Sequence, residues 1–167
     1  MLSLRELPRI EVLQEDARQI PTLDPQSVLA FLSVLVVAAD VERRLDSHFS
    51  RYGLSHGRFV ILMLLRRRGE PMSPAELADG AEVTRATVTG LLDSLEADGY
   101  VLRSARKGDG RMIDVKLTKK GKELLERTLP DHYARIASFM VDLTRAEKKT
   151  LVDLMAKVRD RIVREEG

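Results

Sequence analysis

The sequence predicts a mainly α-helical protein with one small β-hairpin near its centre. Apolar residues recur at helical spacing along most of the 167 residues. The exception is the stretch from residue 111 to 117, where Ile113, Val115 and Leu117 alternate with polar residues, as in a strand with one buried face. Two short predicted helices joined by a turn come directly before this hairpin. That order of elements is typical of a winged helix-turn-helix, here flanked by long N- and C-terminal helices.

Composition limits the classes of function. The chain is 44% hydrophobic and 32% charged, as in a soluble globular protein, and its length suits one domain. The absence of cysteine excludes disulfides, thiolate metal sites and peroxide sensing through a thiol. Residues 1–24 carry mixed charges and no apolar run of signal-peptide length, so we expect a cytoplasmic protein.

Residues 1–24 are interpreted as an N-terminal extension that precedes a single domain over residues 25–167. The extension contains Pro8 and Pro21 and has only weak apolar periodicity. Two interpretations remain open: a disordered arm, or a segment with one short helix that packs on a partner subunit.

A long helix is predicted from Pro25 to Tyr52, with Asp24 as its cap. Residues 28–39 are apolar except for Ser33. Such a segment spans only about 18 Å, against roughly 30 Å for the apolar core of a bilayer, so we expect no membrane partner. Because the segment is apolar on all sides, a second copy of the chain is expected to cover part of it.

The next helix is predicted to begin after Ser55 and to end with three arginines at residues 66–68. Cations at a helix C-terminus are favoured by the helix dipole, and direct contact with phosphate is the alternative interpretation. Ser73, Pro74 and Glu76 then form a capping-box pattern at the start of a short helix.

Thr84 is the predicted cap of the second helix of the helix-turn-helix. One side of this helix is an apolar stripe that would face a core, and it consists of Val88, Leu91, Leu92 and Leu95. The opposite side carries Ala86, Thr89, Gly90 and Asp93. Because its first two turns contain no acid, this face can approach a polyanion closely, as the recognition helix of a DNA-binding protein does.

The wing is predicted as strands at residues 100–104 and 111–117 around a turn at residues 108–110. Between residues 101 and 120, seven basic residues against two acids leave a net charge of +5, while the whole chain has only +2. Basic charge is therefore concentrated at the wing, where contact with DNA phosphates is expected.

The C-terminal part predicts a helix over residues 118–141 and a last helix that begins at Thr144 with Glu147 as its capping-box partner. The last helix carries a nearly heptad apolar seam of Leu151, Leu154, Met155, Val158 and Ile162. We therefore expect residues 25–52 and 119–167 to form the interface of a homodimer.

Several stretches together resemble the MarR family of bacterial transcription regulators. They are Ser73 to Ala78, Val83 to Glu96, Gly99 to Val101, Asp109 to Arg111, and Leu117 to Gly121. The resemblance implies a DNA-binding lobe over residues 53–118, in which Arg111 enters a minor groove and Asp109 orients it. The chain departs from the family at Glu82, where members often have glycine, and a left-handed conformation there costs about 1 kcal/mol or more.

The expected function is a sequence-specific regulator that binds double-stranded DNA as a ligand-responsive repressor. The alternative is a winged helix that only binds proteins, which would place exposed apolar residues on the recognition helix. The expected DNA contacts are Ser73, Thr84, Arg85, Ala86, Thr87, Thr89, Arg106, Lys107, Asp109 and Arg111.

The family resemblance also implies a pocket for a small effector where the long helices meet the DNA-binding lobe. His48, Arg51, Tyr52 and Arg58 lie near that junction and could hold an anionic or phenolic molecule, or could simply cap helix ends. The histidines lack metal-ligand spacing, and the sequence has no enzyme motif, so we expect no metal, no cofactor and no catalytic residue.

Overall fold

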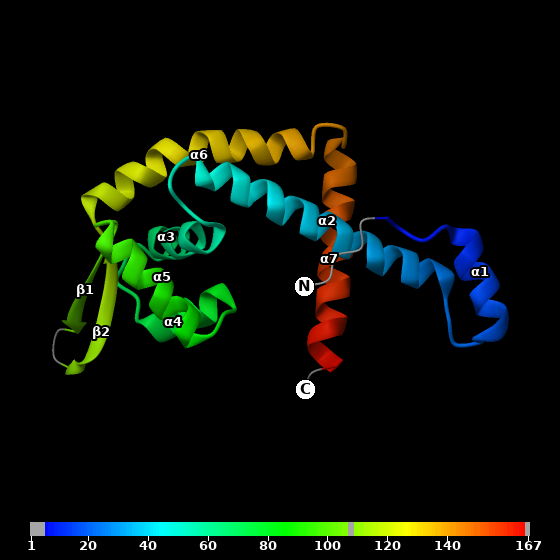
Figure 1. Cartoon of the computed structure of the whole chain (residues 1–167), viewed down its shortest axis with the longest axis horizontal. Helices are drawn as coiled ribbons and strands as arrows, with labels where there is room; N and C mark the ends of the chain where they lie inside the picture. Colours follow the sequence, from blue (N-terminus) through cyan, green and yellow to red (C-terminus); the bar gives the residue numbers. More distant parts are fainter. Residues whose placement is uncertain (1–5, 107–108, 166–167) are drawn as a thin grey trace. The chain divides into compact units, whose positions relative to one another are not determined.

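The computed structural model describes residues 6–106 and 109–165, without the side chains of residues 109–111. Helices predominate, and the strands form one antiparallel hairpin (Figure 1). The elements are α1 (Ile10–Gln19), α2 (Pro25–Ser50), α3 (His56–Arg68), α4 (Pro74–Ala81), α5 (Arg85–Ala97), β1 (Val101–Arg106), β2 (Asp109–Leu117), α6 (Lys119–Phe139) and α7 (Arg145–Glu165). This is the mainly α-helical fold with a hairpin wing that the sequence predicts. No helix within the described residues is both long enough and apolar enough to span a membrane.

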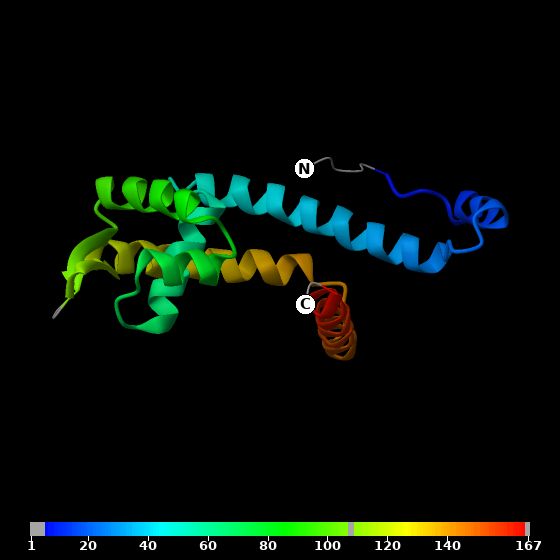
Figure 2. The same ribbon diagram turned by 90° about the horizontal axis from the view of Figure 1, so that it is seen from below.

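The N-terminal extension contains α1, which lies beside the first turns of α2 (Figure 2). Leu13 is buried, with 7% of its surface exposed. The interpretation of this segment as a disordered arm is therefore wrong for residues 10–19. As predicted, the Asp24 carboxylate caps α2 by accepting from the backbone N–H groups of Gln26 and Ser27.

The core of the lobe expected to bind DNA forms where α3, α4 and α5 pack on one another and on the hairpin. Its fully buried side chains include Leu62, Leu77, Leu92, Leu95 and Val115. Met72, just before α4, exchanges backbone hydrogen bonds of 3.0 and 2.8 Å with Val115 of β2. This short bridge attaches the start of the helix-turn-helix to the wing.

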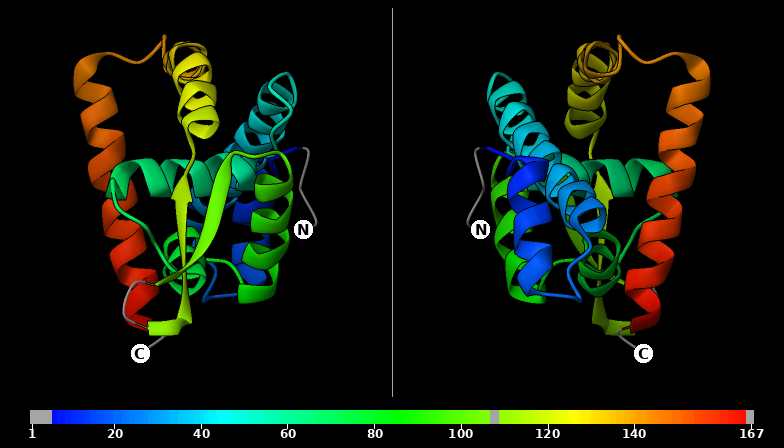
Figure 3. Two further views of the ribbon diagram at one scale, coloured as in Figure 1. Left: turned by 90° about the vertical axis from the view of Figure 1, so that its left-hand side faces the viewer. Right: turned by 90° about the vertical axis from the view of Figure 1, so that its right-hand side faces the viewer.

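The two strands form the antiparallel hairpin seen in Figure 3. Both strands are longer than the sequence predicts. Backbone pairing starts at Val101 with Leu117 and continues, past an irregularity after Ala105, to Arg106 with Asp109. Asp109 and Gly110 therefore belong to β2 and not to the turn. The predicted turn was therefore wrong at these two residues, because strand preferences depend more on the neighbouring strand than on the residue itself.

The start of α6 is fixed to the base of the wing. The Thr118 hydroxyl donates to the Gly99 carbonyl at 2.7 Å and accepts from the Gly121 backbone N–H at 3.1 Å. A Cβ atom on Gly121 would lie 2.2 Å from the carbonyl oxygen of Tyr100, so only glycine fits there. Wing and helix are thus in close backbone contact.

The last helix, α7, begins with the predicted capping box. The Thr144 backbone N–H donates to the Glu147 carboxylate at 2.7 Å, and the Glu147 backbone N–H donates to the Thr144 hydroxyl at 3.3 Å. No residue of α7 is buried in the single chain. Its apolar seam is exposed, with Leu154 and Ile162 each at 49%.

Candidate nucleic-acid interface

The first helix of the helix-turn-helix is held by a complete capping box. The Ser73 backbone N–H and hydroxyl both donate to one oxygen of the Glu76 carboxylate at 2.8 Å, and the Glu76 backbone N–H donates back to the hydroxyl at 3.2 Å. These bonds to Ser73 hold the pKa of the Glu76 carboxyl below its usual value. Because Ser73 is only 7% exposed and its hydroxyl is used in the cap, we leave it out of the proposed DNA contacts.

The turn between the two helices contains Glu82 in the left-handed conformation, at φ 53° and ψ 43°. It is the one non-glycine residue with positive φ in the described part of the chain. Its backbone N–H still reaches the Ala78 and Asp79 carbonyls, which closes α4. The turn thus keeps the conformation suited to glycine, at a cost of about 1–2 kcal/mol.

The recognition helix α5 presents the two faces expected from the sequence. Val88, Leu92 and Leu95 are fully buried, while Leu91 is half-buried. The outward residues of its first two turns are all exposed: Arg85, Ala86, Thr87, Thr89 and Gly90. This face is small and polar, with no apolar patch for a protein partner.

Hydroxyl groups on this face bond within the helix. The Thr84 hydroxyl caps the helix by accepting from the Thr87 backbone N–H at 3.1 Å, and the two hydroxyls lie 2.8 Å apart. The Thr89 hydroxyl donates to the Arg85 carbonyl at 2.9 Å. No ion pair forms at the Arg85 guanidinium with any described residue, so this cation is available to a ligand outside the chain.

The basic residues of the wing differ in how they are held. Arg106 donates from Nε and Nη2 to one oxygen of Asp114, at 2.9 and 2.7 Å. Lys107 lies outside the described residues, as do the side chains of Asp109 and Arg111. The predicted contact between these last two therefore remains a prediction.

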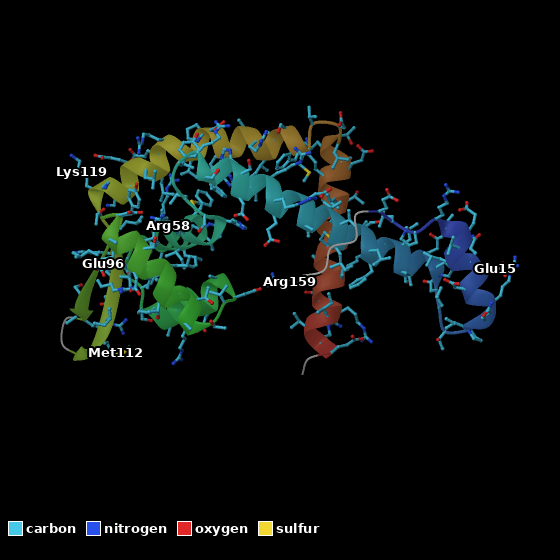
Figure 4. The ribbon with its side chains drawn as sticks, in the orientation of Figure 1. Glu15, Arg58, Glu96, Met112, Lys119 and Arg159 are labelled. Atoms are coloured by element: carbon cyan, nitrogen blue, oxygen red, sulfur yellow. The ribbon has the colours of Figure 1, made fainter. Side chains whose placement is uncertain are left out.

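A further residue, Arg103 on β1, was missed as a functional residue by sequence reasoning, which counted it only as a charge. It donates to Asp93 at 2.5 Å and to the backbone carbonyl of Thr89 at 3.2 Å. Its own backbone N–H donates to Glu96, whose side chain lies where α5 passes the hairpin (Figure 4). The sequence did contain a signal for these contacts, namely two acids on the predicted helix, Asp93 and Glu96, followed by a basic residue on the next strand.

The proposed effector residues lie around the end of α2 and the start of α3. His48 is buried, and its ring centroid lies 5.7 Å from that of Tyr52, while Arg51 is exposed. Arg58 is bound within the lobe, because it pairs with Asp98 and donates to the Gly53 carbonyl at 3.0 Å. This ion pair gives Arg58 a structural role whether or not it also meets an effector. No group of three or more potential metal ligands occurs among the described residues.

Comparison of the sequence with known proteins identifies the family. The sequence model of the MarR family matches residues 54–113. The transcriptional repressor YetL of Bacillus subtilis (strain 168) is 36% identical over 96% of this chain and 97% of its own length. The chain belongs to the MarR family. The regulator PecS of Dickeya dadantii (strain 3937) is 31% identical over 95% of this chain and 97% of its own length.

Solved MarR-family structures share the fold. Sco3205 of Streptomyces coelicolor, a MarR family regulator crystallised in complex with DNA, has a TM-score of 0.76 and 28% identity. The match covers 83% of this chain and 88% of that one. The protein is thus a MarR-family DNA-binding transcription regulator, and the protein-binding module is not favoured.

Proposed function

We propose that this protein is a homodimeric, ligand-responsive repressor that acts in the cytoplasm on a pseudo-palindromic operator. The observation that carries the proposal is the outward face of α5, which is exposed, free of acids in its first two turns and bordered by a basic wing. Such a face suits base readout in a major groove. Repression is favoured because YetL, at 36% identity over nearly the full length, is named a repressor.

The proposed DNA contacts divide into two kinds. Thr84, Arg85, Ala86, Thr87 and Thr89 approach base edges in the major groove, whereas Arg106 and Lys107 contact phosphates. Arg111 enters the adjacent minor groove, where the negative potential attracts arginine, and Asp109 orients it. This pairing is proposed from the sequence, because residues two apart on an extended segment point to the same side.

The dimer is supported by apolar surface on helices at both ends of the chain. Phe31 and Val37 of α2 are 57% and 58% exposed, and the whole seam of α7 is uncovered. A second copy would cover these side chains, since two-fold dimers bury the same surface of each subunit. Two recognition helices related by this symmetry would read two half-sites of one operator.

The effector is proposed to be an anionic or phenolic molecule that binds beside His48, Arg51, Tyr52 and Arg58. Aromatic rings are concentrated there: Phe49 stacks on Phe59 with ring centroids 4.2 Å apart and on His56 at 5.9 Å. Phe49 and Phe59 are buried, so this aromatic cluster would form the floor of the site, and the exposed Arg51 and the half-buried Tyr52 would meet the molecule.

The test begins with the operator, identified by sequencing the DNA crosslinked to the protein in cells. The wild type should bind this duplex more tightly than a scrambled duplex, with an affinity that falls steeply as salt rises. Thr89→Ala should lower the preference for the operator. Equal binding to both duplexes, or an affinity indifferent to salt, would contradict the proposal.

The wing is tested on the same duplex at fixed salt. Arg111→Ala should weaken binding by roughly 1 to 3 kcal/mol without changing the melting temperature. Asp109→Ala should also weaken it, although removing an acid makes the wing more positive, because the arginine then loses its preset orientation. Tighter binding by Asp109→Ala would show that the wing acts by charge alone.

A further inference from the structure

We propose that Arg103 is a positioning residue that sets the orientation of the recognition helix α5 relative to the wing, and through it the discrimination between DNA sequences. This inference rests on the proposed function, because it concerns how the same surface reads DNA. Arg103 itself is not proposed to contact DNA.

The side chain of Arg103 reaches across from β1 to three residues along α5. Nη1 donates to Asp93 at 2.5 Å and lies 3.5 Å from the Glu96 carboxylate, and Nη2 donates to the Thr89 carbonyl at 3.2 Å. The backbone N–H of Arg103 adds a bond of 2.9 Å to Glu96. Residues 89, 93 and 96 follow one side of a helix over two turns, so the contacts resist both rotation and sliding of α5.

These contacts need the shape of a guanidinium group as well as its charge. A planar fork can donate to two acceptors in fixed directions, whereas a lysine ammonium is a compact charge on a flexible stem. The Arg103 side chain is 25% exposed, and its Nη atoms are directed at protein oxygens. It is therefore poorly placed to contact a phosphate as well.

The position of α5 matters more for base readout than for phosphate binding. Hydrogen bonds to base edges require a fixed alignment of donors and acceptors, while phosphate contacts carry no sequence information. One of the fixed points is the backbone of Thr89, whose side chain is on the exposed face. A loosened α5 should thus lose operator affinity but keep its affinity for DNA in general.

The experiment uses the full chain and two duplexes, the operator and a scrambled sequence, each titrated at several salt concentrations. Arg103→Lys keeps the charge and is the decisive variant. We expect it to lower the ratio of operator affinity to scrambled affinity about tenfold. Its affinity for scrambled DNA and its salt slope should match the wild type.

Two further variants support the comparison. Arg103→Ala should lower the ratio at least as much as Arg103→Lys, with the same salt slope as the wild type. Arg18→Ala is the matched control, because Arg18 is also paired with an acid, Glu15 at 2.6 Å, but lies on α1. It should leave the ratio unchanged.

Several results would overturn the inference. A wild-type ratio for Arg103→Lys would show that charge suffices, and a salt slope lowered by about 0.9 in Arg103→Ala would identify a phosphate contact. If Arg103→Ala does not fold, Asp93→Ala is used together with Arg103→Lys. Asp93→Ala should lower the ratio of operator affinity to scrambled affinity, and an unchanged ratio would contradict the positioning role of Arg103. A wild type without preference for any operator would refute the proposed function together with this inference.

Discussion

At the scale of single residues, the arginines of the DNA-binding lobe have the same charge but different roles. Three of them each bind a carboxylate of the protein. Arg58 pairs with Asp98, Arg103 with Asp93, and Arg106 with Asp114. Arg85 has no such partner among the described residues. The net charge of the wing region therefore overstates its attraction for phosphates, since each bound carboxylate offsets a positive charge and occupies some of the five N–H donors of the guanidinium.

The capping glutamate Glu76 predicts a pH dependence of stability. The hydrogen bonds from Ser73 lower the pKa of its carboxyl most, and the charges of Arg68 and Arg106 lower it more weakly. Burial acts in the opposite direction but does not cancel these effects. Because the folded-state pKa lies below the unfolded value of 4.5, the stabilisation is complete above that value and is lost as pH falls through the folded-state pKa. We expect Glu76→Gln to melt below the wild type at pH 7 and to approach it as the solution becomes acidic.

The comparison is made by thermal melting followed by circular dichroism, between about pH 7 and pH 3. Glu70→Gln is the control, because Glu70 is exposed and makes no ion pair with a described residue. A constant difference in melting temperature between wild type and Glu76→Gln at every pH would show that the carboxylate charge plays no part in the cap.

At the scale of secondary-structure elements, the junction between wing and α6 depends on close backbone approach. Gly121→Ala would place a Cβ atom 2.2 Å from the Tyr100 carbonyl oxygen, so the first turn of α6 or the base of β1 must shift. Overpacking of this kind costs about 1–3 kcal/mol. We expect the free energy of unfolding, measured by urea denaturation, to fall by that amount.

Gly90→Ala provides the same chemical change in a helix without the clash. Nothing lies within 4 Å of a Cβ atom at Gly90, which is in the interior of α5. Alanine there should raise the free energy of unfolding by up to about 1 kcal/mol, because glycine is the poorer helix former. If both variants lost stability equally, the clash at Gly121 would not be the cause.

At the scale of the whole molecule, the exposed apolar side chains of α7 predict that the protein binds its operator as a dimer. Val158→Asp would bring two unpaired carboxylates into the proposed dimer interface, which is strongly unfavourable. We expect the Val158→Asp variant to sediment as a monomer at micromolar concentration. The operator affinity should fall with it, because one subunit engages only one half-site.

Ala156→Asp is the control for this variant, since residue 156 lies on the opposite side of α7 from residue 158 and is also exposed. It introduces the same charge and loses more helix propensity than Val158→Asp, but it should remain dimeric. For the dimer, half-site centres should lie about 10 bp apart or a multiple of this. Five extra base pairs between the half-sites should weaken binding, whereas a monomer that binds one half-site at full affinity would contradict the dimer.

The sequence by itself determined the features that depend on neighbouring residues. Helix starts at Asp24, Ser55, Ser73, Thr84 and Thr144 were predicted, because a cap is a bond between residues two or three positions apart. The apolar stripe of α5 and the polarity of its outward face followed from helical periodicity in the same way. These signals, with the family motifs, sufficed to predict the fold class, and they are the basis of the proposed DNA-binding face.

Only the tertiary structure decided which distant side chains meet. Arg58 and Asp98 are forty positions apart, and Arg103 pairs with Asp93 across the junction between helix and hairpin. Sequence patterns cannot select such pairs, because any basic residue of the wing is chemically able to bind any of the acids, and packing alone sets the distances. For the same reason the contacts of Arg103, the burial of Ser73 and the inclusion of Asp109 in β2 became evident only in the folded chain.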